Sequence, residues 1–405
     1  MPLRWVSANP KTGVVNEELP SLRLESSLSG FIGQGERAKV SLPINDRLPP
    51  NWRYATEPWR TVLVCHYDDA EHTILWVGII ARREWGSGPH IKLDLIPVEE
   101  WLKSQLVGNL DYSKSVYEQT HMMRNIGLNR VTYSFNGGVT EEPTGIMRTA
   151  KYSSISGVNC LSAMQALMSM VNGPEFSIRW RWSSEGRLFC NPYVGMRVGR
   201  PAPPGRPAPF TIGAGAEWTR ARDWSQGKGA NSITVLEPKI IKTTMVVQKK
   251  VDPKTKKTVT TRVPKEETYE AVYTLRDQQA INGGYLPSEV FLSPNYGTTD
   301  SVSAATALAM AKPYASRAMK EMRYGNSELD VKIHVDDLIL GSDELWLGDD
   351  ITLDLDNPDL EEINERSVQR MVGWTIDADP VSGEPTTFTP IMLSNPEEDV
   401  VFDNV

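Results

Sequence analysis

Ile74-Leu-Trp-Val-Gly-Ile-Ile-Ala-Arg82 is the middle one of three aliphatic runs, between Thr61-Val-Leu-Val-Cys-His-Tyr67 and His90-Ile-Lys-Leu-Asp-Leu-Ile96. Short turns rich in Asp or Gly separate the runs. Because β-branched and aliphatic runs between such turns are typical of hairpin-connected strands, residues 61–107 predict an antiparallel meander leading into a short helix. In the third run, apolar residues alternate with Lys92 and Asp94, so one face of that strand is expected to lie in a core.

A second set of runs with the same organisation lies near the C-terminal end. It consists of Ile351-Thr-Leu-Asp-Leu355, Arg370-Met-Val-Gly-Trp-Thr-Ile376 and Thr386-Thr-Phe-Thr-Pro-Ile-Met-Leu393. The central runs of the two sets correspond, which suggests one barrel module used twice; two unrelated small meanders remain the alternative. The residues expected in a barrel core or subunit interface are Trp76, Val77, Gly78, Ile79, Ile80, Val372, Gly373 and Trp374.

The composition restricts the class of protein. A chain of 405 residues predicts two to four domains. Its net charge of −8 argues against a protein that grips nucleic acid through the phosphate backbone, although an acidic protein can lie beside DNA that passes without sticking. Cys65, Cys160 and Cys190 are expected to be reduced core residues. Neither a secretory signal nor a membrane-spanning run is expected.

Further elements follow from local patterns along the chain. Strands over residues 22–25 and 38–44 are expected to complete a small closed or nearly closed barrel with the first meander. The proline-rich residues 200–209 predict a linker and domain boundary. The other expected elements are helices over 98–103, 117–124, 161–171 and 301–324, a hairpin over 176–192, and a long, exposed, lysine-rich hairpin over 239–272.

The histidines do not form a recognisable site. His66, His72, His90, His121 and His334 are the complete set, and no two lie at ligand spacing on an expected element. No phosphate-binding or dinucleotide-binding glycine pattern follows a strand. The sequence therefore predicts no catalytic residue, no metal site and no cofactor.

Acidic and aromatic residues leave two alternatives to a purely structural chain. The strongest acid cluster is Asp349, Asp350, Asp354, Asp356 and Asp359. Asp354 and Asp356 would share one face of a strand and could form a glycosidase pair or hold calcium, whereas a solvated face beside a turn needs fewer assumptions. Trp180 and Trp182 could form a sugar-stacking shelf or could be core residues. The lysine-rich hairpin could contact an acidic partner or simply keep an edge soluble.

The order of these pieces resembles the tail hub, baseplate hub or minor tail proteins of long-tailed bacteriophages. Their architecture is similar to that of the hubs of contractile tails and type VI secretion spikes. The resemblance rests on Trp76-Val-Gly-Ile-Ile-Ala-Arg82, Ile91-Lys-Leu-Asp-Leu95 and the Val98-Glu-Glu-Trp-Leu102 helix. It continues through Leu345-Trp-Leu-Gly-Asp-Asp-Ile-Thr-Leu353 and Arg370-Met-Val-Gly-Trp374.

The resemblance implies an α+β, predominantly antiparallel β fold with two tail-tube-like β-barrels and α+β insertions. Carried onto this chain, it assigns 1–110 to the first barrel, 111–209 to an α+β domain that ends in the proline-rich linker, and 210–238 with 327–395 to the second barrel. Residues 239–326 would be an insertion with the basic hairpin and an alanine-rich helix, and 396–405 an acidic tail. The hairpin is longer than the family pattern.

The resemblance also implies a structural, non-enzymatic virion protein at the tail tip, assembled in the host cytoplasm. Two barrels per chain would let a homotrimer form a ring with pseudo-six-fold symmetry that joins the tail tube to the tip and lines or caps the DNA channel. Its expected partners are the tail tube protein, distal tail and tip or fibre proteins and the tape measure protein, with DNA passing through without specific binding. The alternatives are a tail-associated glycan-binding or cell-wall hydrolase module and a receptor-binding tip protein.

Overall fold

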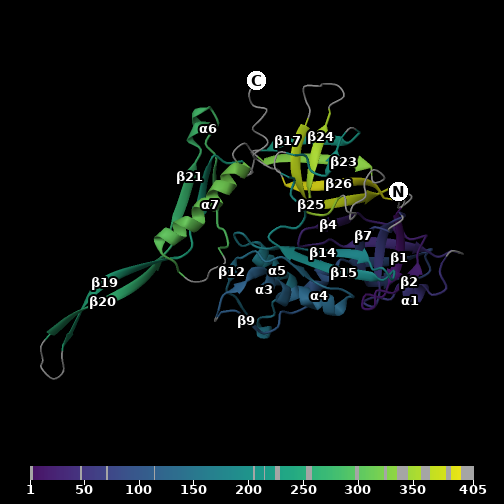
Figure 1. Ribbon diagram of the computed structural model, residues 1–405, viewed down its shortest axis with the longest axis horizontal. Helices are drawn as coiled ribbons and strands as arrows, with labels where there is room; N and C mark the ends of the chain where they lie inside the picture. The colour runs from purple at the N-terminus through teal and green to yellow at the C-terminus, as the bar shows by residue number, and fades with distance from the viewer. Residues whose placement is uncertain are drawn as a thin grey trace. The chain divides into compact units, whose positions relative to one another are not determined.

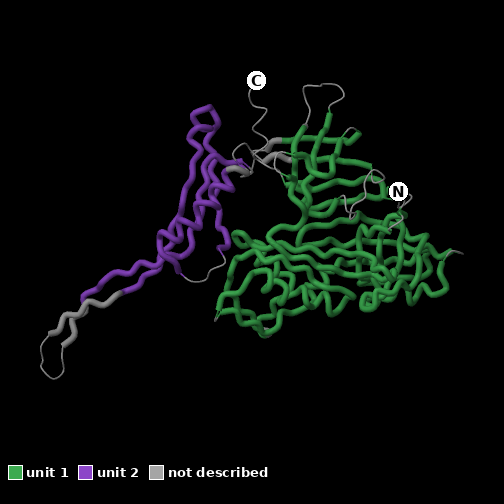
Figure 2. Tube along the Cα trace, viewed as in Figure 1, with its two compact units in different colours: residues 1–221, 329–405 green, residues 222–328 purple. Residues whose placement is uncertain are grey.

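The chain forms two compact units in the computed structural model, unit 1 with residues Met1–Ala221 and Leu329–Val405 and unit 2 with Arg222–Glu328 (Figure 2). The structure describes residues 3–45, 48–69, 72–113, 115–203, 206–213, 215–223, 229–251, 258–296, 301–322, 326–334, 345–356, 365–379 and 385–393. Asp359 and the predicted acidic tail lie outside these residues.

The first sheet of unit 1 contains the first predicted meander, which the structure confirms as β6–β7–β8. Its order is β2-β1-β6-β7-β8-β5-β3, with all pairs antiparallel. The strands are β1 (Leu3–Ala8), β2 (Val15–Glu18), β3 (Arg23–Leu24), β5 (Ala38–Pro43), β6 (Val62–Tyr67), β7 (Ile74–Glu84) and β8 (His90–Ile96). The described pairs leave β2 and β3 as edges, so the sheet is an open half-barrel and not a closed one. Both edge strands are short, which limits the backbone that they expose.

The second sheet contains the other predicted meander, β24–β25–β26, drawn in yellow in Figure 1. Its order is β16-β24-β25-β26-β23-β17. The strands are β16 (Phe210–Ile212), β17 (Glu217–Asp223), β23 (Asn326–His334), β24 (Asp350–Leu355), β25 (Glu365–Ala378) and β26 (Pro385–Leu393). The N-terminal strand β4 (Leu28–Phe31) also pairs with β25, from Gly373 to Ile376. A strand from the region of the first sheet is therefore hydrogen-bonded into the second.

The two sheets share one core. Residues of the first sheet such as Trp76 and Ile80 belong to the same buried cluster as Trp374 and Phe388 of the second. The opposite face of β7 carries Val77 and Ile79, which belong to a separate cluster with the α+β part. Because side chains alternate along a strand, β7 is buried on both faces, which explains why its sequence is an unbroken apolar run.

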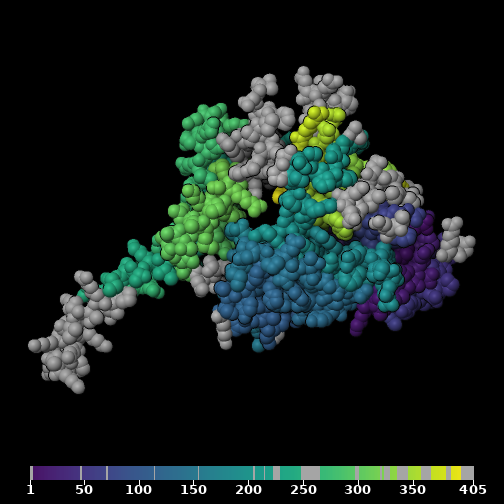
Figure 3. Space-filling model, in the orientation of Figure 1, coloured from purple at the N-terminus to yellow at the C-terminus, as the bar shows by residue number. Residues whose placement is uncertain are grey.

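The α+β part is built on the predicted hairpin, now β14 (Glu175–Trp182) and β15 (Leu188–Gly195), and Figure 3 shows its residues, blue to teal, as one continuous mass. Helix α5 (Cys160–Met168) begins where the Asn159 side chain accepts a hydrogen bond from the Ser162 N–H. The helix predicted over 117–124 is shorter than expected, because α3 (Gln119–Met123) passes into a π-helical turn, Arg124–Leu128, before α4 (Asn129–Ser134). The remaining short elements of unit 1 are α1 (Trp52–Ala55), α2 (Val98–Trp101), the 3₁₀ turns Leu102–Ser104 and Ser154–Ser156, β9 (Leu110–Asp111), β10 (Tyr117–Glu118), β11 (Thr140–Glu141), β12 (Met147–Arg148) and β13 (Lys151–Tyr152).

Unit 2 holds a three-stranded sheet in which β18 (Ser232–Leu236) lies between β21 (Val272–Arg276) and β22 (Glu289–Leu292). This corrects the assignment of residues 210–238 as a whole to the second barrel, since β18 takes its hydrogen bonds in unit 2. Helices α6 (Gln278–Asn282) and α7 (Ala304–Met322) accompany this sheet, and α7 continues through Pro313. The long hairpin is formed by β19 (Ile240–Val251) and β20 (Thr258–Tyr269).

The proline-rich segment lies within unit 1 and does not separate the two units. The Ala202 N–H donates to the Asp350 carboxylate at 2.7 Å and the Ala208 N–H to the Thr352 hydroxyl at 2.7 Å. These bonds attach the segment to β24, because prolines leave few other backbone donors there. The fold class is confirmed as α+β with predominantly antiparallel strands, and the other predicted domain bounds stay predictions.

Candidate functional site

The central strands of the two meanders each place a tryptophan over a glycine. A Cβ atom on Gly78 would lie 2.2 Å from the Trp76 ring, and one on Gly30 of β4 would lie 2.7 Å from the Trp374 ring. Real Cβ atoms do not approach ring atoms this closely, so both glycines are required by packing. The matching tryptophans thus lie flat against backbone in the shared core.

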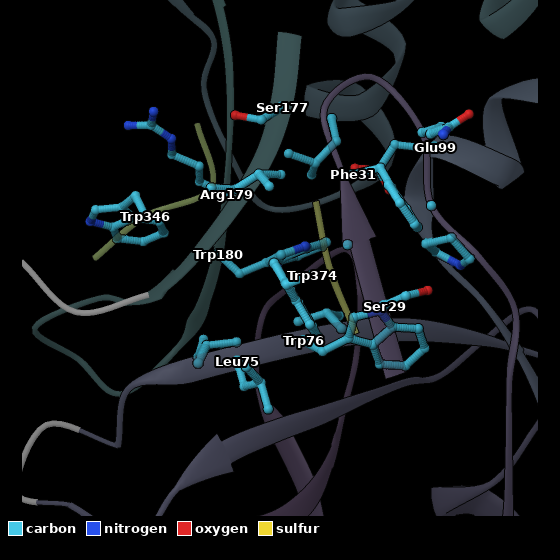
Figure 4. Close-up of a pocket in the computed structure, with 18 residues that line it drawn as sticks. Ser29, Phe31, Leu75, Trp76, Glu99, Ser177, Arg179, Trp180, Trp346 and Trp374 are labelled. Carbon is cyan, nitrogen blue, oxygen red and sulfur yellow. The ribbon is translucent and has the colours of Figure 1, made fainter. Parts of the chain in front are cut away.

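Trp76 and Trp374 line one cavity of about 100 Å³ inside unit 1 (Figure 4). Its walls come from β4, β7, β14 and the segment that precedes β24, so parts distant in the sequence meet here. The residues labelled in Figure 4 are Ser29, Phe31, Leu75, Trp76, Glu99, Ser177, Arg179, Trp180, Trp346 and Trp374. The Ser177 hydroxyl is buried and has no hydrogen-bond partner among the described residues.

Glu99 is the carboxylate of this cavity. Burial raises the pKa of Glu99 to about 7, against the opposing effect of backbone hydrogen bonds that include one with Ile178. Burial also raises the pKa of the nearby Cys190 thiol, and the Glu99 charge adds to that shift. A single carboxyl with a raised pKa can hold or release a proton near neutral pH, but acid–base catalysis needs a partner group and a reachable substrate.

Two histidines come together that the sequence analysis kept apart. The His66 and His72 rings lie edge to face with centroids 5.2 Å apart, and the Trp182 ring is 6.3 Å from His66. The Trp182 indole donates to the His72 carbonyl at 2.8 Å, and burial lowers the pKa of His66. The turn between β6 and β7, with His72 at φ +50°, creates this proximity, which sequence spacing does not reveal. Within the described residues, no group of three or more His, Cys, Asp or Glu side chains could hold a metal ion.

Arginine side chains form ion pairs with the acids of the predicted cluster. Asp349 is buried and accepts hydrogen bonds from the Arg200 guanidinium and backbone N–H, and Arg197 donates to Asp350. Asp354 lies 2.7 Å and Asp356 3.7 Å from the guanidinium of one arginine, Arg366. The two acids therefore share a strand face as predicted, and one exposed cation pairs with both of them, as on an ordinary solvated face.

An ion pair between Arg370 and Glu175 joins the second sheet to the α+β part. Arg370 of β25 donates through Nη1 to Glu175 of β14 at 2.8 Å and through Nη2 to the other carboxylate oxygen and to the Val198 carbonyl. Its Nε lies 3.3 Å from the Gly348 carbonyl. Both side chains are largely shielded from water, so this two-point ion pair is stronger than a surface pair.

The remaining candidate residues are mostly buried. Trp76, Val77, Ile79, Ile80 and Trp374 are core residues, and their role in a subunit interface stays a prediction. Trp180 and Trp182 are partly buried and pack against the α+β core, so they do not form an open shelf. Cys65, Cys160 and Cys190 are free and buried, as predicted. No helix in the described residues has the length and apolar character to span a membrane.

Comparison with known proteins connects this fold to tail proteins. The chain is similar to the tail protein from Neisseria meningitidis MC58, with 10% identity, 96% of each chain covered and a TM-score of 0.52. Weaker likenesses are a 43 kDa tail protein of prophage MuSo2 from Shewanella oneidensis (9% identity, 96% and 98% covered, TM-score 0.49) and prophage tail protein gp18 from Listeria monocytogenes EGD-e (8%, 96% and 95%, 0.47). No protein-family model and no curated protein sequence matches the chain. The chain thus shares the overall fold of the Neisseria meningitidis tail protein.

Proposed function

We propose that this chain is a structural tail hub, a homotrimer whose six sheets form a ring of pseudo-six-fold symmetry between the tail tube and the tail tip. The observation that carries the proposal is that two meander sheets share one compact unit, with the fold of a tail protein. Three chains with two similar sheets each present six similar surfaces, which match a six-fold tube on one side while leaving three-fold symmetry for a tip on the other.

The same proposal names the partners and the location. The hub would contact the tail tube protein, the tape measure protein and distal tail and tip or fibre proteins in the virion, after assembly in the host cytoplasm. It would line or cap the channel through which DNA passes. The net charge of −8 supports a wall that repels phosphate and does not retain the genome.

Particle mass tests this proposal. Mass photometry of the purified chain should show a species three times its 45.2 kDa mass, and mixing with tail tube subunits should give larger rings. A chain that stays monomeric and never associates with the tube would overturn the hub.

The alternative of a cell-wall hydrolase or glycan-binding module has less support, because Asp354 and Asp356 both face Arg366. Zymography on host peptidoglycan separates the two functions. A structural hub leaves the substrate intact, whereas clearing that Asp354→Asn abolishes would establish the hydrolase.

A further inference from the structure

A second, larger pocket lies beside the ion pairs of unit 1. It has a volume of about 520 Å³, and its lining includes Glu142, Arg179, Tyr193, Arg197, Arg200 and Trp346. All of its residues belong to the α+β part and to the segments that flank the second sheet, and of them only Asp349 was among the acidic residues considered from the sequence. Three arginines in one pocket raise the question of which negative groups they serve.

Two of the three arginines already have carboxylate partners. Arg200 holds Asp349 through its side chain and its backbone N–H, and the Trp346 N–H also donates to Asp349 at 2.9 Å. Arg197 donates to Asp350, yet its buried Nε has no hydrogen-bond partner among the described residues. The acceptors Asp349 and Asp350 are therefore largely used by these two arginines.

Arg179 is different. Its guanidinium carbon lies 4.8 Å from the centre of the Tyr193 ring and 5.4 Å from that of Trp346. Within the described part of the chain it has no hydrogen bond or ion pair, and the Tyr193 hydroxyl donates to Glu142 at 2.6 Å. Figure 4 shows the guanidinium beside Trp346 and directed away from Trp180. Burial lowers the pKa of Arg179, although the charges of Tyr193, Asp349 and Glu142 act in the opposite direction.

The chemistry of this arrangement selects a planar anion. A guanidinium held against two aromatic rings presents its N–H groups in its own plane, which suits the two oxygens of a carboxylate. A phosphate would bring a larger negative charge next to Glu142 and Asp349, which also line the pocket. The ring faces and the Met196 side chain, 44% exposed, suit apolar groups on either side of that carboxylate.

The sequence of this chain contains such a peptide directly after β26. Leu393, at the end of β26, pairs with Arg370, whose guanidinium donates to the Val198 carbonyl between Arg197 and Gly199 of the pocket. Residues 394–405, which follow, read Ser-Asn-Pro-Glu-Glu-Asp-Val-Val-Phe-Asp-Asn-Val. Twelve residues can extend to about 40 Å, so reach is not limiting, and the sequence combines acids with Val400, Val401 and Phe402.

The geometry points to a carboxylate-binding site in which Arg179 receives an aspartate or glutamate of an extended acidic peptide, supplied by residues 394–405 of the same chain or of a second copy. This inference does not depend on the hub. Its ligand is the side-chain carboxylate, and the source of the peptide is separated experimentally.

Peptide binding to the full chain tests the site. In one variant of the full chain, Glu397→Gln, Glu398→Gln, Asp399→Asn and Asp403→Asn remove the internal acids. A fluorescent peptide with the native 394–405 sequence should bind this variant, and fluorescence anisotropy should show weaker binding as salt is raised. An added Arg179→Gln substitution should weaken binding by roughly tenfold or more, because a charge-assisted, two-point contact is lost.

The controls keep the result specific. Arg181→Gln is the matched control, since Arg181 lies on the same strand and stacks on Phe189 at 4.9 Å but does not line the pocket. It should leave binding unchanged, and circular dichroism should show native folding of every variant. A peptide with its four acids replaced by amides should not bind. Absence of binding by the native peptide, or equal binding by the Arg179→Gln and Arg181→Gln chains, would overturn the site.

Two further arms identify the source. If residues 394–405 occupy the pocket, the unmodified chain should bind the added peptide more weakly than the amide variant. Equal binding to both chains would overturn the assignment to the chain's own segment. Occupancy within one chain should be independent of protein concentration, whereas exchange between copies should release the added peptide as unmodified chain is titrated in.

Discussion

Arg366 and Arg370 lie on the same strand, β25, but differ in how much water surrounds them. The Arg366 side chain is 61% exposed and pairs with acids that are themselves exposed. Arg370 is 15% exposed, its partner Glu175 is 23% exposed, and two backbone carbonyls accept further bonds. Shielding strengthens the second pair and also makes the loss of one partner more costly.

Replacing Arg370 by Met should therefore lower the free energy of unfolding by about 2–3 kcal/mol, because Glu175 would be left partly buried without its cation. Arg366→Met is the matched control on the same strand and should cost less than about 1 kcal/mol. Urea unfolding followed by circular dichroism measures both. Equal losses for the two variants would contradict the role given to Arg370.

Glu99 should make stability depend on pH. Its pKa is about 7 in the folded chain and 4.5 in the reference state, so the folded state holds the proton more tightly and ionisation destabilises it. The penalty is absent below about pH 4.5, grows as pH rises toward 7 and is constant above that. Glu99→Gln should then raise the melting temperature above pH 7, by a stability gain on the order of 1 kcal/mol, and have no effect at pH 4.

Thermal melts of the two chains at pH 4, 6 and 8 check this prediction. Glu185→Gln, in the exposed turn of the β14–β15 hairpin, serves as a control and should give parallel curves. If the melting temperatures of the Glu99→Gln and native chains differ by the same amount at every pH, the pH dependence of stability does not come from Glu99.

In strands β7 and β25, the position of a tryptophan ring depends on a neighbouring glycine that has no side chain. Each is the middle strand of a meander, and each has its tryptophan in the shared core beside a glycine that leaves room for the ring. Pairing of β4 with β25 places Gly30 opposite Trp374. The close fit of ring and backbone therefore helps to hold a strand of the N-terminal region in the second sheet.

Gly78→Ala should lower the free energy of unfolding by about 1–3 kcal/mol, since its methyl group would overlap the Trp76 ring. Gly86→Ala is the control, because nothing lies within 4 Å of its added Cβ, and it should be nearly neutral. Chemical denaturation gives the two values, and tryptophan fluorescence reports displacement of the ring. A neutral Gly78→Ala would show that the ring can move aside freely.

At the scale of the whole molecule, unit 2 is inserted between neighbouring strands of unit 1. The chain leaves the second sheet after β17 and returns at β23, and these strands are adjacent in that sheet. A Gly/Ser linker of about 12 residues spans roughly 20 Å, which is close to the length of β17. The two strands can therefore be joined whichever way they run.

Replacing residues 224–325 with such a linker should give a soluble chain that unfolds in one cooperative transition, because unit 1 keeps both of its core clusters. Calorimetry and circular dichroism measure this. A shortened chain without cooperative unfolding would show that unit 1 needs unit 2 to fold.

Local patterning was enough to predict both meanders, the α5 helix, the β14–β15 hairpin, the long hairpin and the reduced cysteines. Strand and helix periodicity is set by neighbouring residues, since alternate side chains face opposite sides of a sheet. The resemblance to tail hubs, which rested on the order of these elements, agrees with the fold of the Neisseria meningitidis tail protein.

Local sequence patterns could not predict the contacts between segments that are distant in the chain. The pairing of β4 with β25, the Arg370–Glu175 pair and the packing of Arg179 against Trp346 join residues that no short-range pattern relates. Burial and hydrogen bonding of complementary groups stabilise these contacts, whereas closing the long loops between them costs entropy that changes little with loop length. Sequence spacing therefore leaves these contacts unspecified, and the packed molecule is what selects them.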